Sequence, residues 1–87
     1  MNRAETLEAA KKCVCGDREQ DYGSPEINFG TIAAIWSAYL GVPISPIDAI
    51  NMMIQFKTAR IKNGQPKDDS WIDIAGYAAC GCEIQGN

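Results

Sequence analysis

Hydrophobic residues recur every three or four positions along most of the chain, which is the spacing of one face of an α-helix. No segment of useful length alternates with a period of two, so the pattern predicts no β-sheet. The hydrophobic periods and their flanking signals predict four helices, at about residues 4–15, 25–40, 46–62 and 70–84. We therefore expect a single all-α domain over residues 1–87, built as a compact bundle of about four helices.

The first helix has a start signal and a stop signal. Asn2 followed by Glu5 is typical of a capping box, in which each residue satisfies a backbone N–H of the other. Gly16 is expected to end the helix, because glycine is common just past a helix C-terminus. The polar residues 17–23 are then expected to form a loop.

Serine residues are expected to cap the later helices. Ser24 and Ser45 each precede a proline, which suits the first position of a helix. Ser45 and Ser70 are each followed three residues later by an acid, Asp48 and Asp73 respectively. Both acids fit a capping box. One interpretation of Asp48 and Asp73 is therefore structural, and the alternative is a functional role.

The apolar surface exceeds what so short a chain can bury. The third helix is hydrophobic around most of its circumference, which indicates a central position. The fourth helix carries small residues that allow another helix to approach closely: Ala75, Gly76, Ala78, Ala79 and Gly81. Large apolar side chains add to the excess: Trp36, Tyr39, Met52, Met53, Trp71 and Tyr77. We therefore expect a homo-oligomer in which the third and fourth helices pack between subunits.

Charge and composition narrow the partners. The net charge of −3 argues against a nucleic-acid polymer or an anionic membrane surface as the main partner. No apolar run approaches the roughly 20 residues that span a bilayer, and no apolar signal segment follows the N-terminus. These features favour a cytoplasmic location. The chain contains no histidine, so it lacks the commonest general base.

The four cysteines form two closely spaced pairs, Cys13 with Cys15 and Cys80 with Cys82. Residues two apart on a helix point to nearly opposite sides, so neither pair can grip one metal ion. We expect these cysteines to be small buried side chains in a reducing compartment, without bound zinc. The sequence leaves their redox state open.

The acidic residues of the two expected C-terminal helices resemble a known enzyme family. The stretches DAIN at 48–51 and SWID at 70–73 are similar to the E-x-x-E and E-x-x-D helices of MazG-like all-α nucleotide pyrophosphohydrolases. The resemblance covers about residues 44–79 and implies a helix-hairpin core that holds Mg²⁺ against a nucleoside triphosphate. Asn51 and Ser70 replace two of the four carboxylates, so the site is expected to bind Mg²⁺ poorly.

A second resemblance spans nearly the whole chain. The segments DREQDYGSPEINF at 17–29, KTAR at 57–60 and DSWIDIAGY at 69–77, together with Trp36, are similar to a family of small phage and prophage proteins of unknown function. The resemblance implies a viral protein that acts in a bacterial cytoplasm. Proteins of this kind commonly act on nucleotide pools or on the nucleotide signals of host defence.

Several basic and aromatic residues are candidates for binding such a nucleotide. Lys57 and Arg60 lie one turn apart on the third helix, so both can reach one anion. Arg18 can grip a phosphate with two hydrogen bonds. Aromatic side chains can stack on a base, and Asp73 can accept a hydrogen bond from a ribose or a base. The aromatic candidates are Tyr22, Trp71 and Tyr77. The alternative is that Lys57 and Arg60 pair with Asp69 and Asp73 across the hairpin.

Three functions remain open at this stage. The favoured one is a non-catalytic protein that binds and sequesters a nucleotide or a nucleotide-derived signal and needs no cofactor. The second is a Mg²⁺-dependent nucleotide pyrophosphohydrolase that uses Asp48, Asp69 and Asp73. The third is an adaptor that binds only another protein. Ligand identity, oligomer size and host cannot be predicted from the sequence.

Overall fold

The computed structural model describes residues 1–86, and Asn87 lies outside the described residues. The helical segments are α1 (Arg3–Lys12), the π-helical segment η1 (Cys13–Asp17), α2 (Arg18–Tyr22), α3 (Pro25–Leu40), α4 (Pro46–Asn63) and α5 (Asp68–Gly86). The first three segments follow one another without a break and form one rod. The protein therefore has four helical rods, and no strand occurs within residues 1–86. The expectation of an all-α fold with about four helices is confirmed.

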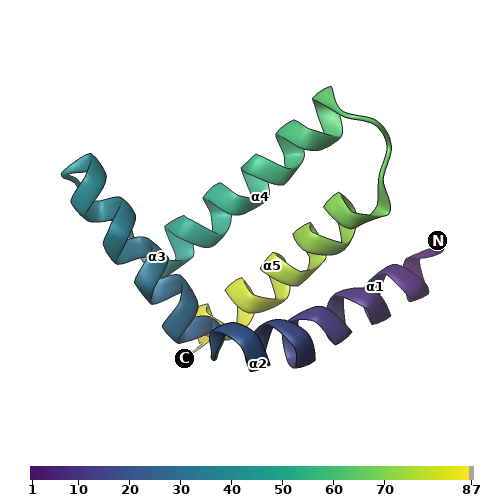
Figure 1. Cartoon of the computed structure of the whole chain (residues 1–87), viewed down its shortest axis with the longest axis horizontal. Helices are drawn as coiled ribbons and strands as arrows, with labels where there is room; N and C mark the ends of the chain where they lie inside the picture. The colour runs from purple at the N-terminus through teal and green to yellow at the C-terminus, as the bar shows by residue number, and fades with distance from the viewer. Residues whose placement is uncertain (87) are drawn as a thin grey trace.

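Three of the rods lie side by side and the fourth crosses them (Figure 1). The helices α4 and α5 form an antiparallel hairpin, and α5 lies between α4 and α1. Helix α3 packs mainly against α4, and its far end projects beyond the other helices. The two C-terminal helices therefore pack against each other within one chain.

The first rod is longer than the sequence indicated. Residues 17–23 were expected to form a loop after Gly16, but helical structure continues to Tyr22. The five residues of α2 include good helix formers, and the π-helical turn before them accommodates Gly16 without ending the rod. The rod ends at Gly23, whose φ of 84° lies in a region that glycine adopts without strain.

Hydrogen bonds at the helix starts confirm three of the four predicted caps. Asn2 and Glu5 form the reciprocal capping box of α1. The hydroxyl of Ser24 accepts from a backbone N–H in the first turn of α3. At α4, the Ser45 backbone N–H donates to the Asp48 carboxylate at 3.0 Å, and the Asp48 backbone N–H donates to the Ser45 hydroxyl at 3.0 Å. Asp48 is thus a capping residue.

The predicted cap of α5 is wrong. Helix α5 begins at Asp68, two residues before Ser70, so Ser70 lies inside the helix rather than at its cap. Asp68 and Asp69 occupy the first turn, where negative charge is favourable to the helix dipole. Asp73 lies in the second turn and pairs with Lys57 instead of capping.

The core sits where α3, α4 and α5 meet. Its buried residues are Phe29, Ala33, Ala49, Ile50 and Cys80. The small residues of α5 allow close approach, as predicted. A Cβ on Gly76 would lie 2.9 Å from Val14 Cγ1 of the first rod, and one on Gly81 would lie 3.5 Å from Ile50 Cγ2 of α4. Substitution of Gly76 is therefore expected to push α5 away from the first rod.

The cysteines differ in burial more than expected. Cys80 is buried and Cys13 is half-buried, but Cys15 and Cys82 are exposed. The interpretation of all four as buried side chains is therefore wrong for the second member of each pair, because positions two apart on a helix face different sides. The four thiols are free within the described residues.

No helix in residues 1–86 is long and apolar enough to cross a membrane.

Candidate functional site

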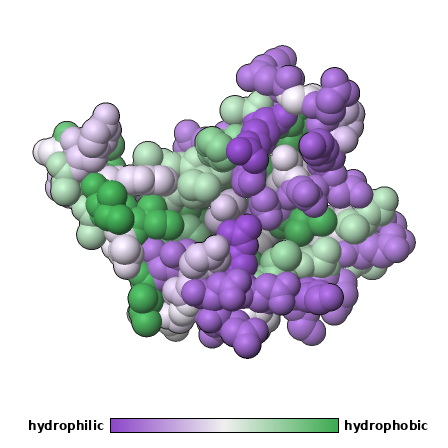
Figure 2. Space-filling view, viewed as in Figure 1, coloured by the Kyte–Doolittle hydropathy of each residue, from purple (hydrophilic) through white to green (hydrophobic). Residues whose placement is uncertain are grey.

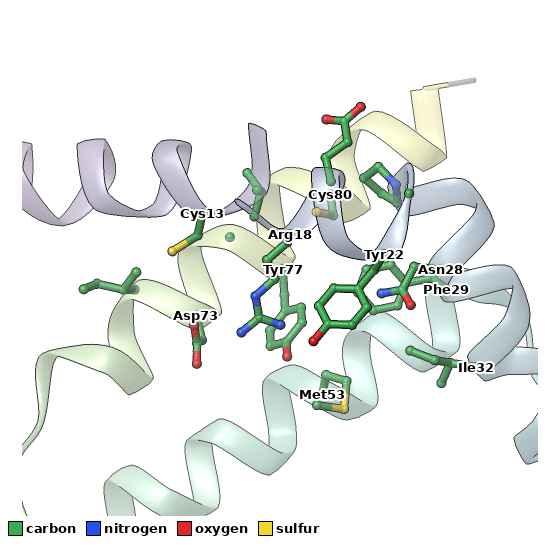
Figure 3. A pocket seen from close by; sticks show the side chains of 16 residues that line it. Cys13, Arg18, Tyr22, Asn28, Phe29, Ile32, Met53, Asp73, Tyr77 and Cys80 are labelled. Carbon is green, nitrogen blue, oxygen red and sulfur yellow. The ribbon is translucent and has the colours of Figure 1, made fainter. Parts of the chain in front are cut away.

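A cavity of about 280 Å³ opens between the first rod and helices α3, α4 and α5. Figure 3 shows side chains from all four rods around it. Its walls combine apolar and aromatic side chains with a few polar ones. The apolar and aromatic residues include Val14, Tyr22, Phe29, Ile32, Met53, Ile72 and Tyr77. The polar residues are Arg18, Glu19, Asn28 and Asp73. A mainly apolar concavity with a few polar groups is the usual form of a small-molecule site.

The π-helical turn aligns the residues that the first rod contributes. In a regular α-helix, residues four apart are offset by about 40° around the axis. A π turn accommodates an extra residue and offsets the following residues in the opposite sense. Val14, Arg18 and Tyr22 therefore stay on one line, and all three face the cavity. Turns of this kind are frequent at functional sites.

Arg18 is the cation that faces this cavity without a protein partner. It forms no ion pair or hydrogen bond within residues 1–86. In Figure 3, its side chain reaches towards the part of the cavity that Tyr22, Tyr77 and Asp73 surround. From the sequence, Arg18 was a candidate ligand-binding residue but was expected to lie in a loop. The structure instead holds it on a helix, which restricts the positions its guanidinium can take.

Lys57 and Asp73 form an ion pair across the α4–α5 hairpin. The Lys57 Nζ lies 2.8 Å from the Asp73 Oδ2, and the two side chains are only 13% and 20% exposed. The alternative interpretation of Lys57, as a partner of an acid across the hairpin, is therefore confirmed. Asp73 lines the cavity while it is engaged with Lys57. The charge of Lys57 is thus already balanced within the protein.

Three predicted ligand-binding residues do not line the cavity: Lys57, Arg60 and Trp71. The Arg60 guanidinium lies over the Phe56 ring at 4.5 Å from its centroid, on the exposed side of α4. Trp71 is 57% exposed near the start of α5. Neither side chain lines the cavity. Of the seven predicted residues, the structure brings Arg18, Tyr22, Asp73 and Tyr77 together around one cavity, with Lys57 adjoining them through Asp73.

The three acids of the hydrolase alternative do not form a cluster. Asp48 caps the start of α4, whereas Asp69 and Asp73 lie near the start of the antiparallel α5. Within residues 1–86 no group of three or more acidic or cysteine side chains could hold a metal ion. Asp48, Asp69 and Asp73 are therefore in three different settings: a cap, an exposed first turn and an ion pair.

Several residues that line the cavity were not predicted from the sequence. Phe29 is buried in the core, and its ring packs edge-on against Tyr77, with the ring centroids 6.0 Å apart. Asn28 is half-buried beside it, and its side-chain amide forms no hydrogen bond within residues 1–86. Met53 contributes from α4. The apolar period of residues 25–40 indicated that one face of α3 is buried, but a single asparagine carried no signal of its own.

Two cysteines also line the cavity, Cys13 and Cys80. Burial raises the pKa of the Cys80 thiol above its ordinary value, and nearby negative groups such as Glu83 act in the same direction. Arg18 lowers this pKa by a smaller amount. Cys80 therefore remains a neutral thiol at neutral pH and adds no charge to the cavity.

Fold and cavity together define a small all-α protein with a cavity of small-molecule size. Residues 5–85 match the family described as Domain of unknown function (DUF6378), and the chain belongs to this family. The chain is 46% identical to the Gene 55 protein of Mycobacterium phage D29 over 74 residues, which are 85% of this chain and 49% of that protein. It is 42% identical to the Gene 55 protein of Mycobacterium phage L5 over 73 residues, which are 83% of this chain and 47% of that protein.

These comparisons confirm the resemblance to a family of phage proteins of unknown function. The chain spans about half the length of the curated relatives it matches. No solved structure matches it. The family assignment therefore carries no activity, and function must be argued from the cavity.

Proposed function

We propose that this protein is a non-catalytic binder of a nucleotide or a nucleotide-derived signal, held in the cavity between the first rod and α3, α4 and α5. The observation that carries the proposal is the Arg18 guanidinium, which faces an aromatic-lined cavity and has no protein partner within residues 1–86. An arginine in this position can form a bidentate pair with a phosphate.

The remaining side chains suit the other parts of a nucleotide. Tyr22 and Tyr77 offer ring faces on which a base can stack. The unpartnered amide of Asn28 can donate to and accept from a base edge. The second carboxylate oxygen of Asp73 can accept a hydrogen bond from a ribose hydroxyl or an amino group, while the first stays bound to Lys57.

Size and charge favour a ligand with a single phosphate group. The cavity volume of about 280 Å³ lies just below the roughly 300–1,000 Å³ that small-molecule sites occupy. Arg18 is the one cation among the described residues that line the cavity, and Glu19 lies on the same walls, so the cavity cannot balance the charge of a triphosphate. A nucleoside monophosphate or a cyclic nucleotide with one phosphodiester therefore fits the site better than a nucleoside triphosphate.

The positions of the acids favour binding over hydrolysis. Mg²⁺ requires several hard oxygen ligands in close to octahedral geometry. Asp48 is committed to the cap of α4 and Asp73 to Lys57. Because the relatives are phage proteins, we propose that the ligand is a nucleotide signal of host defence, sequestered in the bacterial cytoplasm.

Calorimetry across a panel of nucleoside monophosphates, cyclic nucleotides and triphosphates, each with Mg²⁺ and with EDTA, tests the proposal. We expect one class to bind at 1:1 per chain in EDTA, and chromatography to recover that nucleotide unchanged. Mg²⁺-dependent turnover that Asp73→Asn abolishes would contradict the proposal and favour a pyrophosphohydrolase. No binding of any nucleotide would contradict it and favour a protein-binding adaptor.

A further inference from the structure

Helix α3 has one face that packs against the rest of the chain and one that does not. The uncovered side, here called the outer face of α3, consists of Ile27, Thr31, Ala34, Ile35, Ala38 and Tyr39. These residues are spaced by one, three or four positions, so they share one side of the helix. All six are exposed, and Ile27, Ile35 and Tyr39 are 66%, 60% and 87% exposed. Figure 2 shows hydrophobic side chains gathered along α3, whereas hydrophilic ones dominate the tip of the α4–α5 hairpin.

The outer face of α3 lies in a stretch without any charge. No charged residue occurs between Glu26 and Asp48, although the chain as a whole carries a net charge of −3. In a contact with two-fold symmetry, side chains near the axis meet their own copies, so a charge there would face an identical charge, which is unfavourable. An uncharged face avoids this repulsion. It also offers nothing for electrostatic recognition of a charged partner.

The total exposed area is larger than that expected for a folded monomer of this mass. The chain exposes 6174 Å². A folded monomer of 9.5 kDa is expected to expose about 5,050 Å². The excess, roughly 1,100 Å², is similar to the ~800 Å² or more that each partner buries in a stable protein–protein interface. A contact with one second copy is therefore large enough to account for the excess.

We propose that the outer face of α3 binds the same face of a second copy, forming a dimer with two-fold symmetry. The two helices pack side by side, with Ile27, Ile35 and Tyr39 fitting beside Ala34 and Ala38 of the partner. Alternation of large and small side chains permits such ridges-into-grooves packing. The dimer differs from the assembly expected from sequence, in which the third and fourth helices were to lie between subunits. Those two helices, α4 and α5, already cover each other within the chain.

The opposite side of α3 supplies Asn28, Phe29 and Ile32 to the cavity wall. Dimerisation through the outer face would therefore restrict the movement of α3 and of the cavity wall that it forms. The dimer itself does not depend on the proposed nucleotide ligand, because it follows from exposure, charge and area alone.

Sedimentation of Ile35→Glu beside Leu7→Glu tests the dimer. Leu7 is 64% exposed on α1, so it is a matched aliphatic control on another rod. We expect wild type and Leu7→Glu to sediment at twice the 9.5 kDa chain mass at micromolar concentration. Ile35→Glu should be monomeric, with a dimer dissociation constant raised at least about a hundredfold, since it places two unpaired negative charges in one interface.

Circular dichroism identifies any loss of folding, and Tyr39→Glu provides a second charge at a more exposed site of the same face. A monomeric wild type would contradict the proposal. So would a wild-type dimer that survives both Ile35→Glu and Tyr39→Glu in folded form, because another surface would then form the contact. Dissociation by Leu7→Glu alone would place the interface on α1 and equally overturn it.

Discussion

The basic residues that the sequence suggested for phosphate binding belong to two regions, α4 and α2, that look alike in sequence and differ in structure. On α4, Lys57 is paired with Asp73 at 2.8 Å, and Arg60 lies over the Phe56 ring. On α2, Arg18 faces the cavity without an ion pair or a hydrogen bond in the described part of the chain. Lys57 and Arg60 are thus engaged by other groups of the protein, whereas Arg18 has no such partner in the described part of the chain.

The contrast shows that helical spacing alone does not identify an anion site. Lys57 and Arg60 lie one turn apart, which is the right separation for one phosphate. Asp73 of α5 pairs with Lys57, and the ring of Phe56, on α4 itself, contacts Arg60. Whether a basic side chain can bind a ligand therefore depends on which protein groups lie beside it in the folded structure.

The largest expected effect follows from breaking the ion pair. Asp73→Ala leaves the Lys57 ammonium mostly buried without a partner, and we expect the free energy of unfolding to fall by about 2–3 kcal/mol. The double variant Lys57→Met/Asp73→Leu removes both charges and should lose less. Urea denaturation measures both variants. If the double variant is at least as destabilised as Asp73→Ala, the lost packing rather than the unpaired charge is responsible.

The next effect concerns stacking in the cavity. Tyr22→Ala removes a ring face, and we expect nucleotide affinity to fall by about 1–3 kcal/mol, or roughly 5- to 150-fold. Tyr22→Phe keeps the ring and should bind within about threefold of wild type. Calorimetry with the tightest-binding nucleotide compares the two. Equal loss in both variants would mean that the hydroxyl, and not the ring, contacts the ligand.

A smaller effect is expected on the α4 side. Arg60→Ala removes the contact with the Phe56 ring, and an exposed cation–π contact contributes about 0.5–1 kcal/mol. We therefore expect a loss of at most about 1 kcal/mol in the free energy of unfolding, measured in urea. Arg60→Lys should recover part of the loss. A much larger loss would show that Arg60 has a structural role beyond this ring.

The smallest change is a difference in thiol reactivity. Because burial raises the pKa of Cys80, its thiolate forms only at higher pH, and iodoacetamide should modify the exposed Cys82 and Cys15 first. The pKa of Cys80 is higher in the folded state than in the unfolded state. The free energy of unfolding is therefore unaffected by this thiol at neutral pH and falls as the pH rises past the ordinary thiol pKa. Bound nucleotide should slow modification of Cys80 further, while Cys82 should be unaffected. Mass spectrometry of peptides reads out each site.

Much of the fold could be predicted because its helix starts are encoded locally. Ser24 and Ser45 with their following prolines predicted the starts of α3 and α4 correctly. The rod formed by α1, η1 and α2 could not be predicted, because Gly16 is a common helix terminator and only the surrounding packing favours a π turn there. Asp73 was predicted as a possible cap because it follows Ser70 by three residues, and its pairing with Lys57 across the hairpin was the alternative that the structure shows.

The candidate site was predicted in part. The sequence selected Arg18, Tyr22, Asp73 and Tyr77, which come together. It favoured Lys57 and Arg60 over Arg18 as the phosphate-binding cations, however, and Lys57, Arg60 and Trp71 do not line the cavity. The spacing of residues along one helix can be read from a sequence, whereas the packing of α2, α3 and α5 around one cavity cannot. Asn28 could not be selected for the same reason, since only the fold turns it towards the cavity.

The ratio of two dissociation constants tests the central claim most directly. Arg18→Ala and Arg60→Ala each remove one guanidinium from the same protein, and calorimetry in EDTA measures the affinity of each for the tightest-binding nucleotide. The account predicts that Arg18→Ala weakens binding by more than about tenfold, the cost of one charged hydrogen bond, while Arg60→Ala changes it by less than about threefold. The opposite order, or an equal loss in both variants, would contradict the assignment of the cavity as the ligand site.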